Sequence, residues 1–199
     1  MNYVKKKTVF SDIILIGTSL LGSIIAFNFF VQATLISSND IKKLINSAIA
    51  SLDIKAKSFN LIIISISTIT FLISIIFYYL INKFVLIYIL KNKIHKAKLF
   101  GGILIANIPG LLIGAILINS IGLSMESSII SKVLVFCQPI ILSIILKDSF
   151  NSNKQFIKYI SFLIAFSLIN ILVRSIIMDC QHFLIQLLFG HISLSILNW

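Results

Sequence analysis

Residues 99–123 read LFGGILIANIPGLLIGAILINSIGL, an unbroken run without a charged side chain. A helix needs about 20 mostly apolar residues to cross the hydrocarbon core of a bilayer, so this run predicts a membrane-spanning helix. Gly102, Ala106, Gly110 and Gly114 recur in it at every fourth position, which places them on one helix face. Small residues let two helix backbones approach closely, and such packing holds helices together in lipid. The run therefore predicts both a span and the face by which that span packs.

Two interpretations of this small-residue face stay open, packing within the chain and assembly with another chain. Gly110 and Gly114 form the GxxxG core that either interpretation uses. Pro109 lies beside them and lacks an amide hydrogen, so it is expected to kink this helix. Pro139 is expected to do the same in the next apolar run. Two kinked helices either frame a cavity or only shape the bundle.

The composition of the whole chain agrees with a membrane protein. Hydrophobic residues make up 58% of the 199 residues and charged residues 12%, whereas a soluble domain carries roughly 45–50% and about 25%. So few charges do not cover a water-soluble globule, which excludes a soluble enzyme domain, a disordered tail and a disulfide scaffold. We expect an all-α fold, a polytopic bundle of transmembrane helices that forms a single membrane domain over residues 1–199.

Five apolar runs are long enough to be spans. They are residues 10–35, 59–81, 99–123, 129–146 and 159–178. Asn82 and Lys83 follow the second run and are expected to mark its exit from the membrane, with residues 84–90 continuing along the interface. Residues 183–197 are apolar but short and interrupted by polar side chains, so we expect an interfacial or re-entrant segment there, or else a sixth span.

The segment between the first two spans has a different pattern. Its apolar side chains recur at spacings of three and four, and lysine, asparagine and aspartate occupy the other face; the apolar positions are Ile41, Leu44, Ile45, Ala48, Ile49 and Leu52. This pattern predicts an amphipathic helix that lies in the plane of the membrane interface. A solvated loop helix is the alternative.

The charge of +11 arises from 17 basic against 6 acidic residues. In a membrane protein such an excess first indicates topology, because cytoplasmic loops are enriched in Lys and Arg. With a cytoplasmic N-terminus, 11 of the basic residues fall inside and 6 outside. The densest cluster is Lys91, Lys93, Lys96 and Lys98, which is expected to contact anionic lipid headgroups. Without aromatic interleaving or a soluble fold, we expect no nucleic-acid partner.

The sequence offers little catalytic or metal-binding chemistry. Cys180 and His182 are two residues apart, and such positions do not face each other on a helix, which disfavours a Cys/His nucleophilic pair. His182 and His191 have no third ligand nearby, which disfavours a metal site. We therefore expect no catalytic, cofactor-binding or metal residues and a protein that is not an enzyme.

Short motifs add a family resemblance. A basic N-terminal segment, a polar loop at residues 37–58, the phrase Lys98-Leu-Phe-Gly-Gly102 and the phrase Ile108-Pro-Gly-Leu-Leu-Ile-Gly114 follow one another. Over roughly residues 1–178 this order resembles the Yip-domain (Ypt-interacting protein) family of five-span membrane proteins. The apolar tail beyond Met178 departs from that pattern. The resemblance implies a five-span fold and, from eukaryotic members, an adaptor that contacts small GTPases and other membrane proteins; it implies no catalytic residue.

These features favour one function and leave two alternatives. The favoured one is a non-enzymatic protein of the bacterial plasma membrane that acts through helix–helix contacts. It would be an accessory subunit of a membrane-protein partner such as a transporter, or an export or immunity factor for a membrane-active peptide. The first alternative is the substrate-binding membrane subunit of a small-molecule transporter, with a closed cavity at Asn107, Asn119 and Gln138. The second is a membrane peptidase that uses Cys180.

Overall fold

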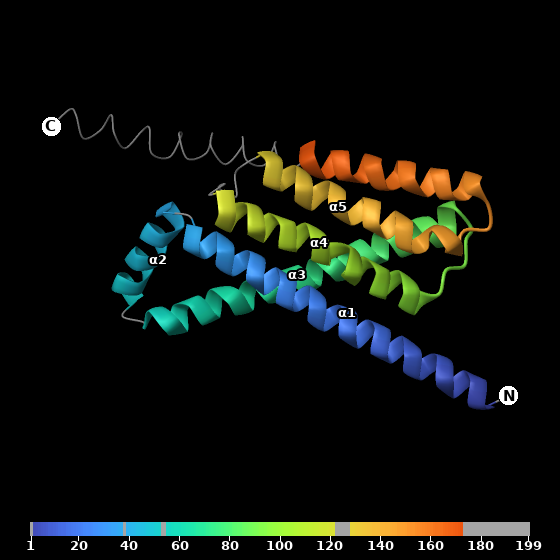
Figure 1. Ribbon diagram of the computed structural model, residues 1–199, viewed down its shortest axis with the longest axis horizontal. Helices are drawn as coiled ribbons and strands as arrows, with labels where there is room; N and C mark the ends of the chain where they lie inside the picture. The colour runs from blue at the N-terminus through green and yellow to red at the C-terminus, as the bar shows by residue number, and fades with distance from the viewer. Residues whose placement is uncertain (1, 38, 53–54, 122–127, 173–199) are drawn as a thin grey trace.

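The computed structural model describes residues 2–37, 39–52, 55–121 and 128–172, which fold almost entirely as helices (Figure 1). Four helices are long and apolar enough to cross a membrane, over Phe10–Ser37, Ala56–Ile89, Lys96–Ile121 and Asn153–Leu172. The expected all-α fold with apolar helices is confirmed. The expected run 129–146 forms a helix of 19 residues that is not among these four, and residues 183–197 lie outside the described residues.

The helices in chain order begin with the long α1 and end with an unlabelled helix that we call the final helix. Their bounds are α1 Asn2–Ser37, α2 Asn39–Leu52, α3 Ala56–Phe84, α4 Lys96–Ile121, α5 Ser128–Leu146 and the final helix Asn153–Leu172. A π-helical turn, η1, continues α3 over Val85–Ile89, and a 3-10 turn, η2, follows α5 over Lys147–Ser149.

The centre of the bundle is α4, which packs between α1 and α5 (Figure 1). In its most apolar stretch 56% of the residues are buried, against 6% in α3. A buried hydrogen bond joins α1 to α4, because the Ser23 hydroxyl donates to the Leu104 carbonyl at 2.6 Å. Polar contacts of this kind between helices hold register in a medium that offers no competing water.

The small-residue face of α4 packs against helices of the same chain. A Cβ atom at Gly110 would lie 3.3 Å from the Cys137 Cβ atom on α5, and one at Gly114 would lie 2.9 Å from the Phe30 ring on α1. Gly102 also faces α5, and Ala106 is fully buried. The close approach of α1 and α5 to α4 thus requires small residues at these positions.

Both prolines lie inside helices that continue past them, Pro109 in α4 and Pro139 in α5. Each removes one backbone hydrogen bond from its helix. The kinks expected from them stay a prediction.

The helix of the second apolar run does not end at Ile81. The helix continues past Asn82 and Lys83 through Phe84 into the π-helical turn. Asn82 is buried, and its amide donates to the Tyr78 carbonyl at 2.8 Å, while its carbonyl oxygen accepts from the Tyr159 hydroxyl at 2.6 Å. This polar side chain is thus satisfied by partners within the bundle. The exit from the membrane at Asn82 and Lys83 stays a prediction. The 34-residue helix exceeds the bilayer core, and tilt accommodates such excess.

The connection between α1 and α3 forms a helix, α2, which joins the neighbouring ends of these two helices (Figure 1). Lys42 and Lys43 are exposed on it, whereas Ile45 and Ile49 are half-buried.

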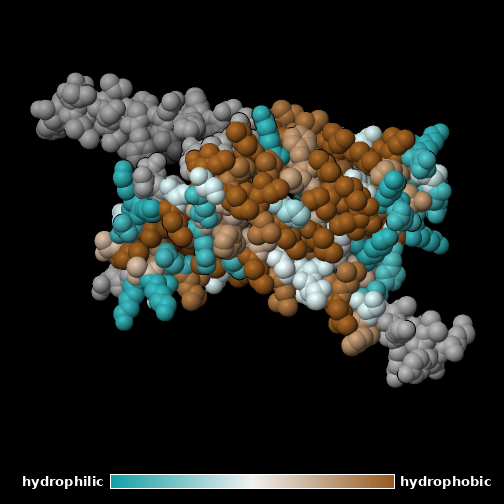
Figure 2. Space-filling model, in the orientation of Figure 1, coloured by the Kyte–Doolittle hydropathy of each residue, from teal (hydrophilic) through white to brown (hydrophobic). Residues whose placement is uncertain are grey.

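Hydrophilic side chains gather at the two ends of the bundle, and hydrophobic ones cover the middle (Figure 2). The exposed lysines near the start of α1 are Lys91, Lys93, Lys96, Lys147, Lys154 and Lys158, and those at the opposite end are Lys42, Lys43, Lys55, Lys57 and Lys132. This separation matches the two interfaces of a bilayer.

The glycine contacts predict a contrast between two substitutions. Gly110→Leu should destabilise the bundle by about 1–3 kcal/mol, because a large side chain overpacks the contact with Cys137. Gly17→Leu is the matched control, because a Cβ atom at Gly17 meets nothing within 4 Å. The fraction that stays monodisperse on size exclusion after heating in detergent measures the effect. Equal thermal midpoints for the two variants would contradict the close α4–α5 packing.

Candidate functional site

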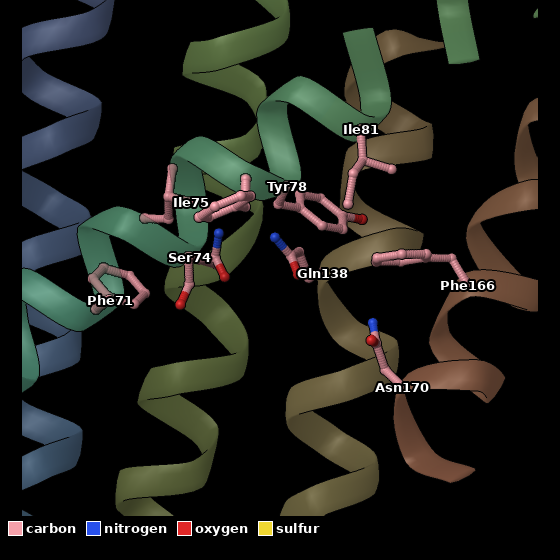
Figure 3. A pocket seen from close by; sticks show the side chains of 10 residues that line it. Phe71, Ser74, Ile75, Tyr78, Ile81, Gln138, Phe166 and Asn170 are labelled. Atoms are coloured by element: carbon pink, nitrogen blue, oxygen red, sulfur yellow. The ribbon is translucent and has the colours of Figure 1, made fainter. Parts of the chain in front are cut away.

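An open pocket of about 390 Å³ lies beside α3, α4, α5 and the final helix (Figure 3). Its volume falls in the range of small-molecule sites. Aromatic and aliphatic side chains come mainly from α3 and polar ones from all four helices; the lining is Phe71, Ser74, Ile75, Phe77, Tyr78, Ile81, Asn107, Gln138, Phe166 and Asn170. None of these residues carries a charge.

Three carboxamides converge on this pocket from three helices. Asn107 lies on α4, Gln138 on α5 and Asn170 on the final helix. The Asn107 amide donates to the Ile103 carbonyl of its own helix at 2.8 Å, which fixes the rotamer and directs the oxygen away from that bond. The side chains of Gln138 and Asn170 form no hydrogen bond with another described residue. Each carboxamide therefore still offers at least one amide hydrogen and a carbonyl oxygen to a molecule in the pocket.

Aromatic rings also line the pocket, from α3 and from the final helix. Tyr78 and Phe166 meet with their ring centroids 5.9 Å apart, and both are labelled at the pocket in Figure 3. Phe71 is held by stacking on Phe27 of α1, at 4.2 Å and an interplanar angle of 6°. Flat rings fixed in this way present π-faces to a planar ligand.

The Tyr78 hydroxyl is a buried polar group at the edge of the pocket. It forms no hydrogen bond of good geometry with the described residues. The adjacent Asn82 is already engaged, because its carbonyl oxygen accepts from the Tyr159 hydroxyl. A buried hydroxyl without a partner is costly, and a hydrogen-bonding ligand would relieve that cost.

A set of hydrogen bonds fastens the end of α3 to the connection between α5 and the final helix. The Asn92 amide donates to the Ser149 carbonyl at 3.1 Å, and the Gln155 amide donates to the Leu90 carbonyl at 3.2 Å. Lys91, which lies between Leu90 and Asn92, has a φ of 50°, in the left-handed region that few non-glycine residues occupy. The Tyr159–Asn82 hydrogen bond completes this set. It joins the C-terminal end of α3 to the final helix and to the turn that follows α5.

Part of this site was expected from the sequence. Asn107 and Gln138 were expected to converge and do line the pocket, whereas Asn119 is exposed and lines no part of it. The expected cavity was closed, and the observed pocket is open. Asn170 and Tyr78 also line the pocket, and neither was expected there from the sequence. Asn170 carried a usable signal, because it is a polar residue within the apolar run 159–178.

The remaining expected residues lie elsewhere. Lys91, Lys93 and Lys96 are exposed and Lys98 is half-buried, at the end of the bundle that also holds the start of α1. Headgroup contact by this cluster stays a prediction. The described residues hold no group of three or more side chains suited to a metal ion. Cys180, His182 and His191 lie outside the described residues.

Comparison with known proteins found no match among family models, curated proteins or solved structures. The resemblance to the Yip-domain family therefore stays an expectation from the sequence motifs.

The buried Tyr159–Asn82 pair predicts a specific loss of stability. Tyr159→Phe leaves the Asn82 carbonyl oxygen buried without its donor, which should cost about 1–3 kcal/mol. Tyr88→Phe is the matched control, because the Tyr88 ring is 69% exposed. Thermal unfolding in detergent compares the two. A midpoint for Tyr159→Phe equal to that of the Tyr88→Phe control would argue against this hydrogen bond.

Proposed function

We propose that this membrane protein binds a neutral, planar, hydrogen-bonding small molecule in the pocket between α3, α4, α5 and the final helix. In this proposal it serves as the substrate-binding membrane subunit of a small-molecule transporter. The observation that carries the proposal is the presence of Asn107, Gln138 and Asn170 in one pocket together with the rings of Tyr78 and Phe166. A carboxamide within a membrane-spanning helix is costly unless it has a hydrogen-bond partner. Three of them in one pocket therefore indicate a ligand that supplies such partners.

The lining determines the class of ligand. Carboxamides match molecules that carry both donors and acceptors on one edge, and aromatic rings match a flat ring system. The lining residues supply no charge to pair with an ionic ligand, and a buried charge without a partner is strongly disfavoured. A neutral heterocycle with amide-like edges satisfies all three conditions.

The same proposal places the protein in the bacterial plasma membrane with a cytoplasmic N-terminus. Supporting this orientation, more exposed lysines gather at the bundle end that holds the start of α1 than at the opposite end. α2 then lies in the outer interface as an amphipathic helix. Its exposed Lys42 and Lys43 and half-buried Ile45 and Ile49 support that position.

The proposal predicts ligand-dependent stability that needs the carboxamides. Purified protein in detergent is heated with each member of a panel of neutral heterocycles, namely nucleobases, nucleosides and riboflavin. A member that binds should raise the midpoint in a concentration-dependent way, because binding to the folded state stabilises it. Gln138→Leu should weaken this response about 5- to 30-fold in concentration, the equivalent of about 1–2 kcal/mol for a lost hydrogen bond.

Asn119→Leu is the matched control, because Asn119 is an exposed carboxamide of α4 that does not line the pocket. Its response should equal that of the unmodified chain. The proposal fails if no panel member shifts the midpoint, or if the Gln138→Leu and Asn119→Leu variants respond alike.

A second proposal retains the function through helix–helix contacts, as an accessory subunit or an export or immunity factor for a membrane-active peptide. The α4 glycine face is occupied by α1 and α5, so a partner would need another surface. The observation that favours this proposal is α3, whose most apolar stretch is only 6% buried. Ile66, Ile69 and Ile73 are exposed along it.

Site-specific photo-crosslinking in intact membranes tests the second proposal. A photoreactive residue at Ile69 of α3 should give a discrete protein-sized product, because a partner helix would cover this face. The same residue at Ile25 on α1, which is 67% exposed against 58% for Ile69, is the control and should crosslink lipid alone. Lipid adducts alone at both positions would rule out α3 as the partner surface.

A further inference from the structure

A second pocket, of about 380 Å³, lies between the last turns of α1 and the first turns of α3. From α1 it is lined by Gln32, Leu35 and Ile36, and from α3 by Lys57, Asn60, Leu61 and Ile64. It shares no residue with the pocket lined by Asn107, Gln138 and Asn170, which we call the carboxamide pocket. We call it the α1–α3 pocket.

The crossing of α1 and α3 explains why this pocket is open. The two helices touch where Phe27 stacks on Phe71 and where the Thr68 hydroxyl donates to the side-chain Oδ1 of Asn28 at 3.1 Å. Beyond that contact they diverge toward α2, which joins their ends (Figure 1). The α1–α3 pocket lies in the diverging part, where Gln32 and Ile64 lie nearer to the crossing than Ile36 and Lys57 do.

Its lining combines one cation, two carboxamides and an apolar wall. Lys57 and Asn60 lie within the first turns of α3, and Leu61 and Ile64 follow deeper in the same span. Gln32 faces them from α1. A phosphate group is matched by an ammonium group together with amide donors, and an acyl chain is matched by the aliphatic side chains.

The charges around the α1–α3 pocket have the same sign. Lys42, Lys43 and Lys55 are exposed at this end of the bundle, as is Lys57 itself. Over residues 38–58 the sequence holds four lysines against Asp40 and Asp53, so this segment is net positive. A negatively charged headgroup is attracted to such a region.

From these observations we propose that the α1–α3 pocket binds an anionic phospholipid. The phosphate lies against Lys57, Gln32 and Asn60 donate amide hydrogens to headgroup oxygens, and the upper part of an acyl chain lies along Leu61 and Ile64. A free phosphate ion would share the polar contacts and make no use of the apolar wall. The site is at the opposite end of the bundle from Lys91, Lys93, Lys96 and Lys98, so it is distinct from the headgroup contacts expected there.

Native mass spectrometry of the full chain in detergent tests this proposal. Protein freed of lipid is incubated with phosphatidylglycerol, with phosphatidylcholine or with inorganic phosphate. One retained phosphatidylglycerol is expected at concentrations where neither phosphatidylcholine nor phosphate is retained. Lys57→Gln should weaken retention about fivefold. This is the loss of affinity expected when one lysine near an anionic headgroup is removed.

Lys55→Gln is the matched control, because Lys55 is exposed two residues away and does not line the pocket. Its retention should equal that of the unmodified chain, and size exclusion of each variant verifies folding. Asn60→Leu adds a variant that keeps the charge and should still weaken retention. Equal weakening by Lys57→Gln and Lys55→Gln would show bulk electrostatics and overturn the proposal. Retention of phosphatidylcholine or of inorganic phosphate at the same level would overturn it as well.

Discussion

The structure depends on the close approach of α1 and α5 to α4. Cβ atoms at Gly110 and Gly114 would lie 3.3 Å and 2.9 Å from atoms of the neighbouring helices, so a larger side chain at either position would force those helices to shift. Lipid chains are as apolar as leucine, so burial of apolar area does not by itself drive helices together in a bilayer. Van der Waals contact over small residues and the Ser23–Leu104 hydrogen bond supply the attraction instead. The glycine face is thereby used within the chain.

Around this tightly packed centre, α3 is attached mainly near its middle and at its C-terminal end. Near its middle it contacts α1 through Phe71 and Thr68, and at its C-terminal end Asn82, Leu90 and Asn92 hydrogen-bond to other segments. A helix attached at few points leaves space beside it. The carboxamide pocket lies on one side of α3, and the α1–α3 pocket lies where α3 diverges from α1. Both proposed binding sites therefore follow from the loose packing of this one helix.

Hydropathy predicted the helices better than it predicted their ends. The runs 10–35 and 99–123 correspond to helices that end at Ser37 and Ile121, within a few residues of the expected positions. The run 59–81 corresponds to a helix that continues well past Ile81. The polar pair Asn82 and Lys83 had suggested that the membrane interface begins there. The Tyr159 hydroxyl satisfies Asn82 in the interior, and Tyr159 lies 77 residues further along the chain. Local sequence holds no signal for a partner so distant.

The sequence by itself determined that this chain forms apolar helices with basic ends, because hydropathy and charge are properties of each segment alone. It also identified the glycine face of α4 as a packing surface, because that face follows from a fixed four-residue spacing. Only the tertiary structure decided what packs there and which carboxamides share a pocket. Asn107, Gln138 and Asn170 converge whereas Asn119 does not, since convergence depends on the rotation and tilt of four helices relative to one another. Those angles are set by contacts between residues far apart in the chain, and the residue pattern of a single helix does not contain them.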